Sequence, residues 1–267
     1  MENLDRIAAM NRQHWERMVR EGCGFTLPSL DLDRVLIRRY AEGSLDHPPE
    51  PLIWMYPASI LDGVEGKDVL CLASGGGQQS AVFGLQGARV TVVDLAEGQL
   101  QGDRVAAEHY GYPVTTIQAD MRDLSCLSDE SFDLVYQAPS VCYVPDLRPV
   151  FAEVTRVLRP GGVYRVCFTN PATEFVGMES WDGHGYRISL PYAQKEETSG
   201  GSAQFRHYLA DIFNGLLAAG LSIEQVADDP QYFTEHRPPP DPGTWHHYLL
   251  YCGGFAVVSR KRPAGQA

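Results

Sequence analysis

Short apolar runs alternate with amphipathic stretches through the middle of the chain. The apolar runs predict strands at 67–73, 88–94, 114–119, 132–136 and 162–168. Between them, helical spacing is found at 80–86, at 97–110 and through Phe151, Val154 and Leu158. Strands rich in β-branched residues, separated by amphipathic helices, are typical of a parallel sheet covered on both faces. The pattern therefore predicts an α/β, doubly wound fold.

The first 65 residues follow a helical pattern instead. Apolar residues recur near helical spacing from Leu4 to Met18, and a shorter pattern covers 32–39. A proline-rich break at 48–51 precedes a third predicted helix at 52–61. We therefore expect 1–65 to form a helical lid or extension, and 66–267 to form the main domain.

The last third of the chain departs from simple repetition. It predicts a helix at 205–219 and strands at 221–226 and 254–259. The stretches 171–204 and 229–251 are polar and aromatic, and they fit poorly as core scaffold. We expect both to be insertions over the strand ends, where ligands bind in such sheets.

Composition narrows the classes of partner and location. The 267 residues include 34 acidic and 22 basic side chains, a formal charge of −12. An acidic surface repels phosphate backbones, which argues against a nucleic-acid substrate. The charged N-terminus and the lack of a long apolar run argue against a signal peptide and a membrane span. The six scattered cysteines form no CxxC pair and no zinc spacing, which favours reduced thiols, no metal and a cytoplasmic location.

Polar residues that could contact a ligand follow three of the predicted strands. The turn Ser74-Gly75-Gly76-Gly77 lies between a strand and a helix, where glycine lets the backbone approach a ligand, although a tight turn alone would also need it. Asp94 ends the second strand and can accept both hydroxyls of a ribose. Asp120 ends the third strand and can accept an adenine amino hydrogen, while Met121 offers an apolar contact to the ring. Together they indicate a nucleoside-containing cofactor.

Five blocks of sequence, in order, extend this pattern. The run 67–168 resembles the class I S-adenosylmethionine (SAM) dependent methyltransferases of the small-molecule kind. The matching blocks are 69–77, 92–95, 119–121, 131–135 and Leu158-Arg159-Pro160-Gly161-Gly162. The resemblance implies a Rossmann-like, mostly parallel seven-stranded sheet with an insertion after the fifth strand, and SAM as the cofactor. The N-terminal helices could also form a homodimer.

The resemblance also implies roles for particular residues. Asp94 would hold the ribose hydroxyls, Asp120 would accept from the adenine amino group, and the Gln137 backbone would lie near the methionine amino group. Leu95 and Met121 would enclose the adenine. The methionine and ribose side would be lined by Ala73, Ser74, Gly75 and Gly77.

The chain departs from the family pattern at two positions. Cys71 replaces the usual acid of the first strand, and Ala73 replaces the usual first glycine. A thiol cannot neutralise the methionine ammonium, so Gln78 or Gln79, at the start of the next helix, is expected to contact it. For Gln78 a polar first turn is an equal alternative.

The acceptor is predicted to be a small molecule methylated at O, N, S or C. The exit of the fourth strand lacks the Asn/Asp-Pro-Pro motif that is typical of base and glutamine N-methylation. His207, expected at the start of the helix after the fifth strand, is the first candidate for a base or substrate contact, and Tyr143 is the second. Three alternatives stay open: another SAM-dependent reaction such as cyclisation or aminocarboxypropyl transfer, a non-catalytic SAM-binding protein, and a nicotinamide dehydrogenase. The last would need glycine where Ser80 stands.

Overall fold

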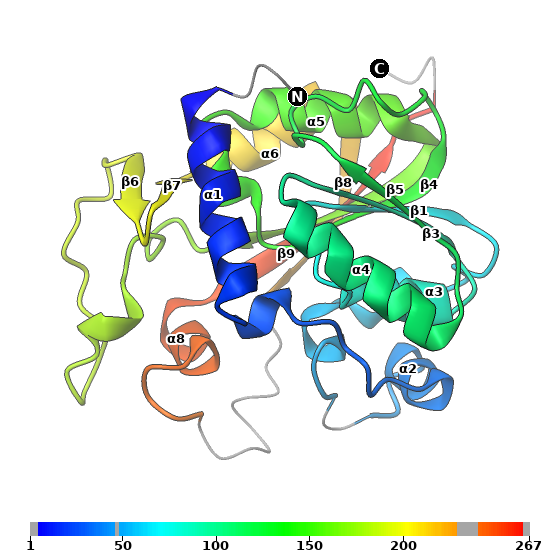
Figure 1. The fold of residues 1–267 in the computed structure, drawn as a ribbon. Coiled ribbons are helices and arrows are strands. Elements are labelled where there is room, and N and C mark those ends of the chain that lie inside the picture. Colours follow the sequence, from blue (N-terminus) through cyan, green and yellow to red (C-terminus); the bar gives the residue numbers. More distant parts are fainter. Residues whose placement is uncertain (1–4, 46–47, 229–239, 264–267) are drawn as a thin grey trace.

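A seven-stranded sheet forms the centre of the computed structural model, which describes residues 5–45, 48–228 and 240–263 (Figure 1). The strand order is β3-β2-β1-β4-β5-β9-β8. The first five strands pair in parallel, and β9 pairs antiparallel with both β5 and β8. The predicted α/β fold with a mostly parallel seven-stranded sheet is confirmed. The strands are β1 (Asp68–Leu72), β2 (Arg89–Asp94), β3 (Val114–Gln118), β4 (Phe132–Gln137), β5 (Leu158–Thr169), β8 (Leu221–Asp228) and β9 (Gly254–Lys261).

Helices cover both faces of the sheet because alternate strand residues point to opposite sides. Val69 and Cys71 of β1 join one core cluster, while Leu70 and Leu72 join another. Figure 1 shows α5 and α6 over one face and α3 and α4 over the other. Their bounds are α3 (Gln79–Leu85), α4 (Glu97–Tyr110), α5 (Leu147–Val157) and α6 (Leu209–Ala218).

The N-terminal region contains fewer helical residues than the pattern predicts. It forms α1 (Arg6–Arg20) and α2 (Arg34–Ala41), with the short 3-10 turn η1 (Gly24–Thr26) between them. The predicted helix at 52–61 is wrong, since that stretch is divided into η2 (Leu52–Trp54) and η3 (Ala58–Leu61). Pro57 lies between the two turns, and proline removes an amide donor and disfavours helical geometry in the residue before it. Leu4 lies outside the described residues.

The insertion after β5 has its own small sheet. A hairpin of β6 (Glu196–Ser199) and β7 (Ser202–Phe205) follows the 3-10 turn η5 (Met178–Ser180). The predicted helix at 205–219 therefore begins later, at Leu209, because Phe205 is already paired in β7. Of the second insertion, 229–239 lie outside the described residues, and Trp245–Cys252 form α8.

Two general features complete the description. All six cysteines lie in the described residues, and none of them forms a disulfide bond. Within the described ranges, no helix has the length and apolar character needed to cross a bilayer.

Candidate active site

A cavity of about 440 Å³ opens at the carboxyl ends of β1, β2, β3, β4 and β5. Its lining comes from these strand ends, from α1, from the segment after β5 and from α8. We call one part the glycine-loop side, formed by Ala73, Ser74, Gly75, Gln78, Gln79, Asp94, Leu95, Asp120 and Met121. We call the other part the aromatic side, formed by Trp54, Tyr56, Tyr136, Phe168, Glu174, Met178, Glu179, Trp245 and Tyr248.

The backbone after β1 turns tightly to form the glycine-loop side. Ala73 adopts a left-handed conformation with φ of 46°, which explains why glycine is usual at this position. At Gly75 a Cβ atom would lie 2.6 Å from Cβ of Gln99 and 3.0 Å from Oδ2 of Asp94. A side chain at Gly75 would therefore clash with Gln99 and Asp94, and glycine is what lets the loop pack this closely against α4 and the end of β2.

Asp94 lies at the end of β2, beside this loop. Its Oδ2 accepts the Gly75 amide at 3.0 Å, and its Oδ1 accepts the Ala96 amide at 2.9 Å. Burial raises the pKa of Asp94 to about 6 despite these donors. The carboxylate faces the cavity and each oxygen keeps a further lone pair, which fits the predicted contact with two ribose hydroxyls.

A second carboxylate, which the sequence analysis missed, supports the loop from beneath. Asp103 of α4 is fully buried and accepts the amides of Gly76 and Gly77, each at 3.1 Å. The Ser80 hydroxyl donates to it at 2.5 Å. Burial raises the pKa of Asp103 to about 7. No spacing rule relates this mid-helix acid to the loop, so only the packing of α4 under α3 reveals it.

Cys71 faces the same buried region and not the cavity. It belongs to the core cluster packed against α3 and α4, and its side chain has no exposed surface. Burial raises the pKa of its thiol well above the usual value, with Asp103 adding to the shift. Cys71 is therefore a neutral core residue here, and the loop takes its carboxylate support from Asp103.

The Asp120 carboxylate is held in a chain of charges. Arg122 donates to both of its oxygens, at 2.6 Å from Nη2 and 3.0 Å from Nε. The Nη1 atom of the same guanidinium contacts Asp5 at 2.6 Å. Since Asp5 is the N-terminal cap of α1, this ion-pair chain connects α1 to the end of β3. Met121 and Leu95 line the cavity beside Asp120, as the predicted adenine contacts require.

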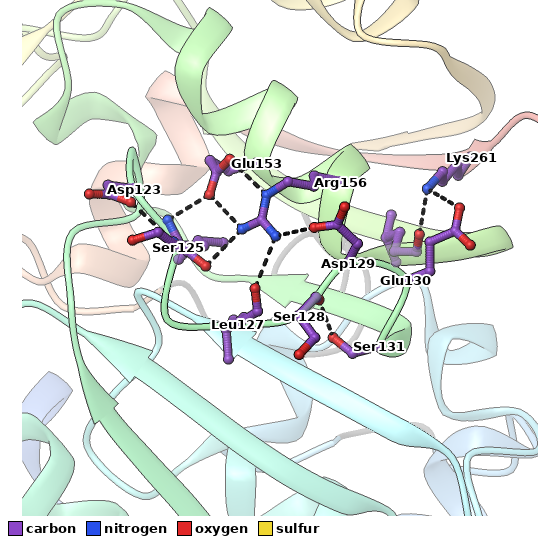
Figure 2. Close-up of polar contacts among 12 residues, drawn as sticks. Asp123, Ser125, Leu127, Ser128, Asp129, Glu130, Ser131, Glu153, Arg156 and Lys261 are labelled. Carbon is purple, nitrogen blue, oxygen red and sulfur yellow. Dashed lines mark hydrogen bonds and ion pairs between the residues drawn. The ribbon is translucent and has the colours of Figure 1, made fainter.

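The connection between β3 and β4, which carries Asp120 and Met121, is fixed from the other end by Arg156 (Figure 2). This α5 guanidinium donates to the carbonyls of Leu124 and Leu127 at 2.7 and 2.9 Å. It also pairs with Glu153 and Asp129. This connection contains no helix or strand, and the contacts of Arg156 hold it in one conformation.

Three other residues predicted to contact the cofactor, Gln78, Gly77 and Gln137, are bonded within the protein. Gln78 lines the cavity, but its Nε2 donates to the carbonyls of Gly24 and Leu27, each at 3.1 Å. Gly77 and Gln137 do not line it. The Gln137 carbonyl accepts from Arg165 at 3.3 Å, and its side chain bonds Ser140 and Tyr164. Ala138 and Ser140 line the cavity at this strand exit instead.

Ser74 lines the cavity and also joins two strand ends. Its hydroxyl donates to the Leu72 carbonyl at 2.9 Å and accepts the Ala138 amide at 3.1 Å. The exits of β1 and β4 are therefore held together directly beneath the cavity floor.

The two candidate catalytic residues differ in position. Tyr143, in η4 (Val141–Tyr143), lines the cavity, and burial raises the pKa of its hydroxyl well above the usual value. This hydroxyl therefore keeps its proton and can donate a hydrogen bond. His207 does not line this cavity and lies between β7 and α6, not in a helix. Its Nε2 bonds the Val141 carbonyl at 3.0 Å, and burial lowers its pKa, so it is a buried residue that holds η4 in place.

The described residues form no candidate metal site. Among the residues that the structure describes, no group of three His, Cys, Asp or Glu side chains could hold a metal ion.

Comparisons with known proteins agree with this geometry. The family described as "Methyltransferase domain" matches residues 70–166. The uncharacterized methyltransferase YbaJ of Bacillus subtilis (strain 168) is 31% identical over 238 residues, which span 85% of this chain and 92% of that protein.

Two solved structures share the fold. An S-adenosylmethionine-dependent methyltransferase from Mesorhizobium loti has a TM-score of 0.59 at 23% identity, covering 76% of this chain and 94% of its own. The 1,6-didemethyltoxoflavin-N1-methyltransferase of Burkholderia thailandensis has a TM-score of 0.58 at 18% identity, covering 98% of this chain and 92% of its own. YbaJ, a methyltransferase, matches this chain along most of the length of both proteins, and the sheet has the strand order given above. The chain therefore belongs to the class I SAM-dependent methyltransferases.

Proposed function

We propose that this enzyme transfers the methyl group of SAM to a small-molecule acceptor bound on the aromatic side of the cavity. The observation that carries the proposal is the continuity of one cavity from Asp94 and Asp120 to a chamber of aromatic rings. The B. thailandensis neighbour supports it, since that protein's structure contains a small heteroaromatic compound together with S-adenosylhomocysteine (SAH). A cytoplasmic location and a homodimer stay predictions of the sequence.

The residues of the glycine-loop side fit the cofactor. Asp94 would accept the ribose hydroxyls, Asp120 would accept the adenine amino group, and Leu95 and Met121 would enclose the ring. SAM, when bound, supplies a methyl group on a sulfonium whose sulfur is a good leaving group. The protein's part is to align the acceptor atom with that methyl group and to exclude water. Tyr143 can orient the acceptor by donating a hydrogen bond, because its hydroxyl stays protonated.

The closed environment of the site depends on the N-terminal region. Ala8, Asn11 and Trp15 of α1 and Phe25 of η1 contribute to the cavity wall. Desolvation strengthens every polar contact inside such a site. The N-terminal segment is therefore expected to serve as the predicted lid.

The first test is calorimetric titration with SAH. We expect micromolar or tighter binding by the wild-type protein, and a loss of about 30-fold or more in Asp94→Ala, because hydrogen bonds to a charged group contribute about 1.5–3 kcal/mol each. Glu108→Ala is the control, since Glu108 is an exposed acid on α4. An absence of SAH binding by the wild-type protein would refute the proposed function.

A second measurement separates methyl transfer from other uses of the same cofactor. Mass spectrometry of turnover mixtures with SAM should show SAH as the product. Release of methylthioadenosine would point to aminocarboxypropyl transfer or cyclisation and would contradict methyl transfer.

A further inference from the structure

A carboxylate on the aromatic side, Glu174, is held by a rigid turn directly after β5. The Asn170 side chain accepts the Ala172 amide at 3.0 Å, and the Thr173 amide donates to the Asn170 carbonyl at 2.9 Å. The same Thr173 is clamped to α8, since its hydroxyl donates to the Cys252 carbonyl at 2.7 Å and its carbonyl accepts from Tyr248 at 3.0 Å. Glu174 therefore has a fixed position in the cavity wall.

Among the described residues, this carboxylate has few hydrogen-bond donors. The Thr169 side chain donates a hydrogen bond to it. The Arg206 guanidinium attracts Glu174 electrostatically, while its Nη1 donates to the carbonyls of residues 191, 192 and 194. A partly buried carboxylate with so few donors has the capacity to bind a hydrogen-bond donor of a ligand.

The aromatic side of the cavity is lined by acidic and not by basic side chains, as far as the chain is described. Among the described residues, the charged side chains that line it are Glu174 and Glu179. The guanidinium in the cavity wall, Arg122, lies on the glycine-loop side and is paired with Asp120 and Asp5. Aromatic rings complete this part of the wall, and their faces attract cations. An anion would meet two carboxylates in this part of the wall, and none of the described residues that form the aromatic side is cationic.

We propose that Glu174 recognises the methyl acceptor through an N–H or O–H group, so that the acceptor is a neutral or cationic, ring-bearing molecule and not an anion. This inference rests on the proposed function, since it assigns the aromatic side to the acceptor. It makes Glu174 the residue that determines which acceptors bind.

The pH dependence of acceptor binding follows from the surroundings of Glu174. Burial raises its pKa to about 8, while the attraction of Arg206 opposes this shift. The thiol of Cys142 and the hydroxyls of Tyr143 and Tyr248 also face it, and burial raises the pKa of each, so they stay neutral near pH 8. A cationic ligand favours the ionised carboxylate and lowers its pKa in the complex. Binding of an amine therefore releases a proton and tightens as the pH rises from 6.5 to 8.5.

The experiment compares probes that share a skeleton and differ in charge. After SAH binding has been verified, the SAH-loaded protein is titrated with tryptamine, tryptophol and indole-3-acetate, and with phenethylamine, 2-phenylethanol and phenylacetate. We expect each amine to bind at least about tenfold more tightly than the matching carboxylate at pH 8. In Glu174→Gln this preference should fall below about threefold, while the affinity for the alcohols and for SAH stays within about threefold of wild type.

The control variant is Glu108→Gln, an exposed acid of α4 outside the cavity wall, which should keep the preference for amines. Three results would overturn the inference: carboxylates that bind as tightly as amines, a preference for amines that survives in Glu174→Gln, or no binding of any probe by protein that binds SAH. A failure of SAH binding would instead overturn the proposed function.

Discussion

At the scale of single residues, two carboxylates determine the shape of the glycine loop after β1. Asp94 holds the Gly75 amide from the cavity side, while Asp103 holds the next two amides from the core side. Backbone amides in such a turn would be costly to bury without acceptors. The loop is therefore pre-shaped by charges that belong to β2 and α4.

Asp94 leads to a prediction about pH. In the free protein its pKa is raised to about 6, so at pH 5 most molecules carry the protonated form. If Asp94 binds the ribose as proposed, the hydroxyls donate to its ionised form and lower its pKa in the complex, so binding releases a proton and tightens as the pH rises. Calorimetry should show SAH binding about tenfold weaker at pH 5 than at pH 8, with a plateau above pH 7.

The matched variant for this prediction is Asp94→Asn, which removes the titrating group and keeps the shape. Its affinity should be weaker throughout and nearly independent of pH. A profile that stays tenfold steep in Asp94→Asn would assign the dependence to Asp103, which lies under the same loop, and would contradict the prediction.

Sequence patterns revealed the residues whose role follows from their place on a strand. The positions of Gly75, Asp94 and Asp120 at the ends of strands were predictable, because parallel strands bring their carboxyl ends to one edge of the sheet. Asp103 and Glu174 were not, since their positions depend on how α4 packs and how α8 clamps a turn. His207 was assigned to a helix start, but it is buried in a connection and bonds the backbone of η4.

At the scale of elements, α1 is bound to the rest of the site by side chains spread along its length. Asn11 donates to the Tyr143 carbonyl at 3.0 Å and accepts the Ala203 amide at 2.8 Å. One turn further on, Glu16 accepts the Gly98 amide of α4 at 3.3 Å. With the Asp5–Arg122 ion pair, these contacts join α1 to η4, β7, α4 and the end of β3.

Substitution of Asn11 tests whether α1 is a structural part of the site. Asn11→Ala removes two hydrogen bonds of a buried side chain, which should lower the free energy of unfolding by about 1–3 kcal/mol. SAH affinity should also fall, because α1 forms part of the cavity wall. Urea denaturation and calorimetry measure the two effects.

The control for this substitution is Gln13→Ala on the exposed face of the same helix, which should change neither quantity. An Asn11→Ala protein with wild-type stability and SAH affinity would show that α1 is dispensable for the site.

Element types were predictable where the hydrophobic period was sustained, as in β1, β2 and α4. They were not predictable where pairing partners decided the outcome. The helix predicted at 205–219 begins only at Leu209, because Phe205 pairs with Glu196 of β6 across a turn of two glycines. At 52–61 the apolar spacing suited a helix, but Pro57 divides it.

At the scale of the whole molecule, a buried arginine joins the N-terminal region to the sheet. Arg165 of β5 has no exposed surface. Its Nε donates to the Tyr56 carbonyl and its Nη2 to the Trp54 carbonyl, each at 2.9 Å. The guanidinium also lies 5.0 Å from the ring centre of Tyr56 and 4.6 Å from that of Tyr136. Carbonyl oxygens and ring faces thus replace a carboxylate as partners of the charge.

Replacement of Arg165 should destabilise the fold as a whole. Arg165→Met removes the guanidinium that donates to the carbonyls of Trp54, Tyr56 and Gln137, and we expect the free energy of unfolding to fall by about 2–4 kcal/mol in urea denaturation. Arg165→Lys keeps a charge but lacks the planar fork, so an intermediate loss is expected. A Met variant as stable as wild type would show that packing alone holds the N-terminal region.

The two sides of the cavity are encoded by different parts of the chain. The glycine-loop side is built mainly from 73–121, whereas much of the aromatic side comes from 174–179 and 245–248, around the antiparallel strand β9. Selection can therefore exchange one module and leave the other intact. Within such a lineage, a new substrate could be accommodated largely by replacing two peripheral segments, while the machinery for the shared donor passes unchanged from one enzyme to the next.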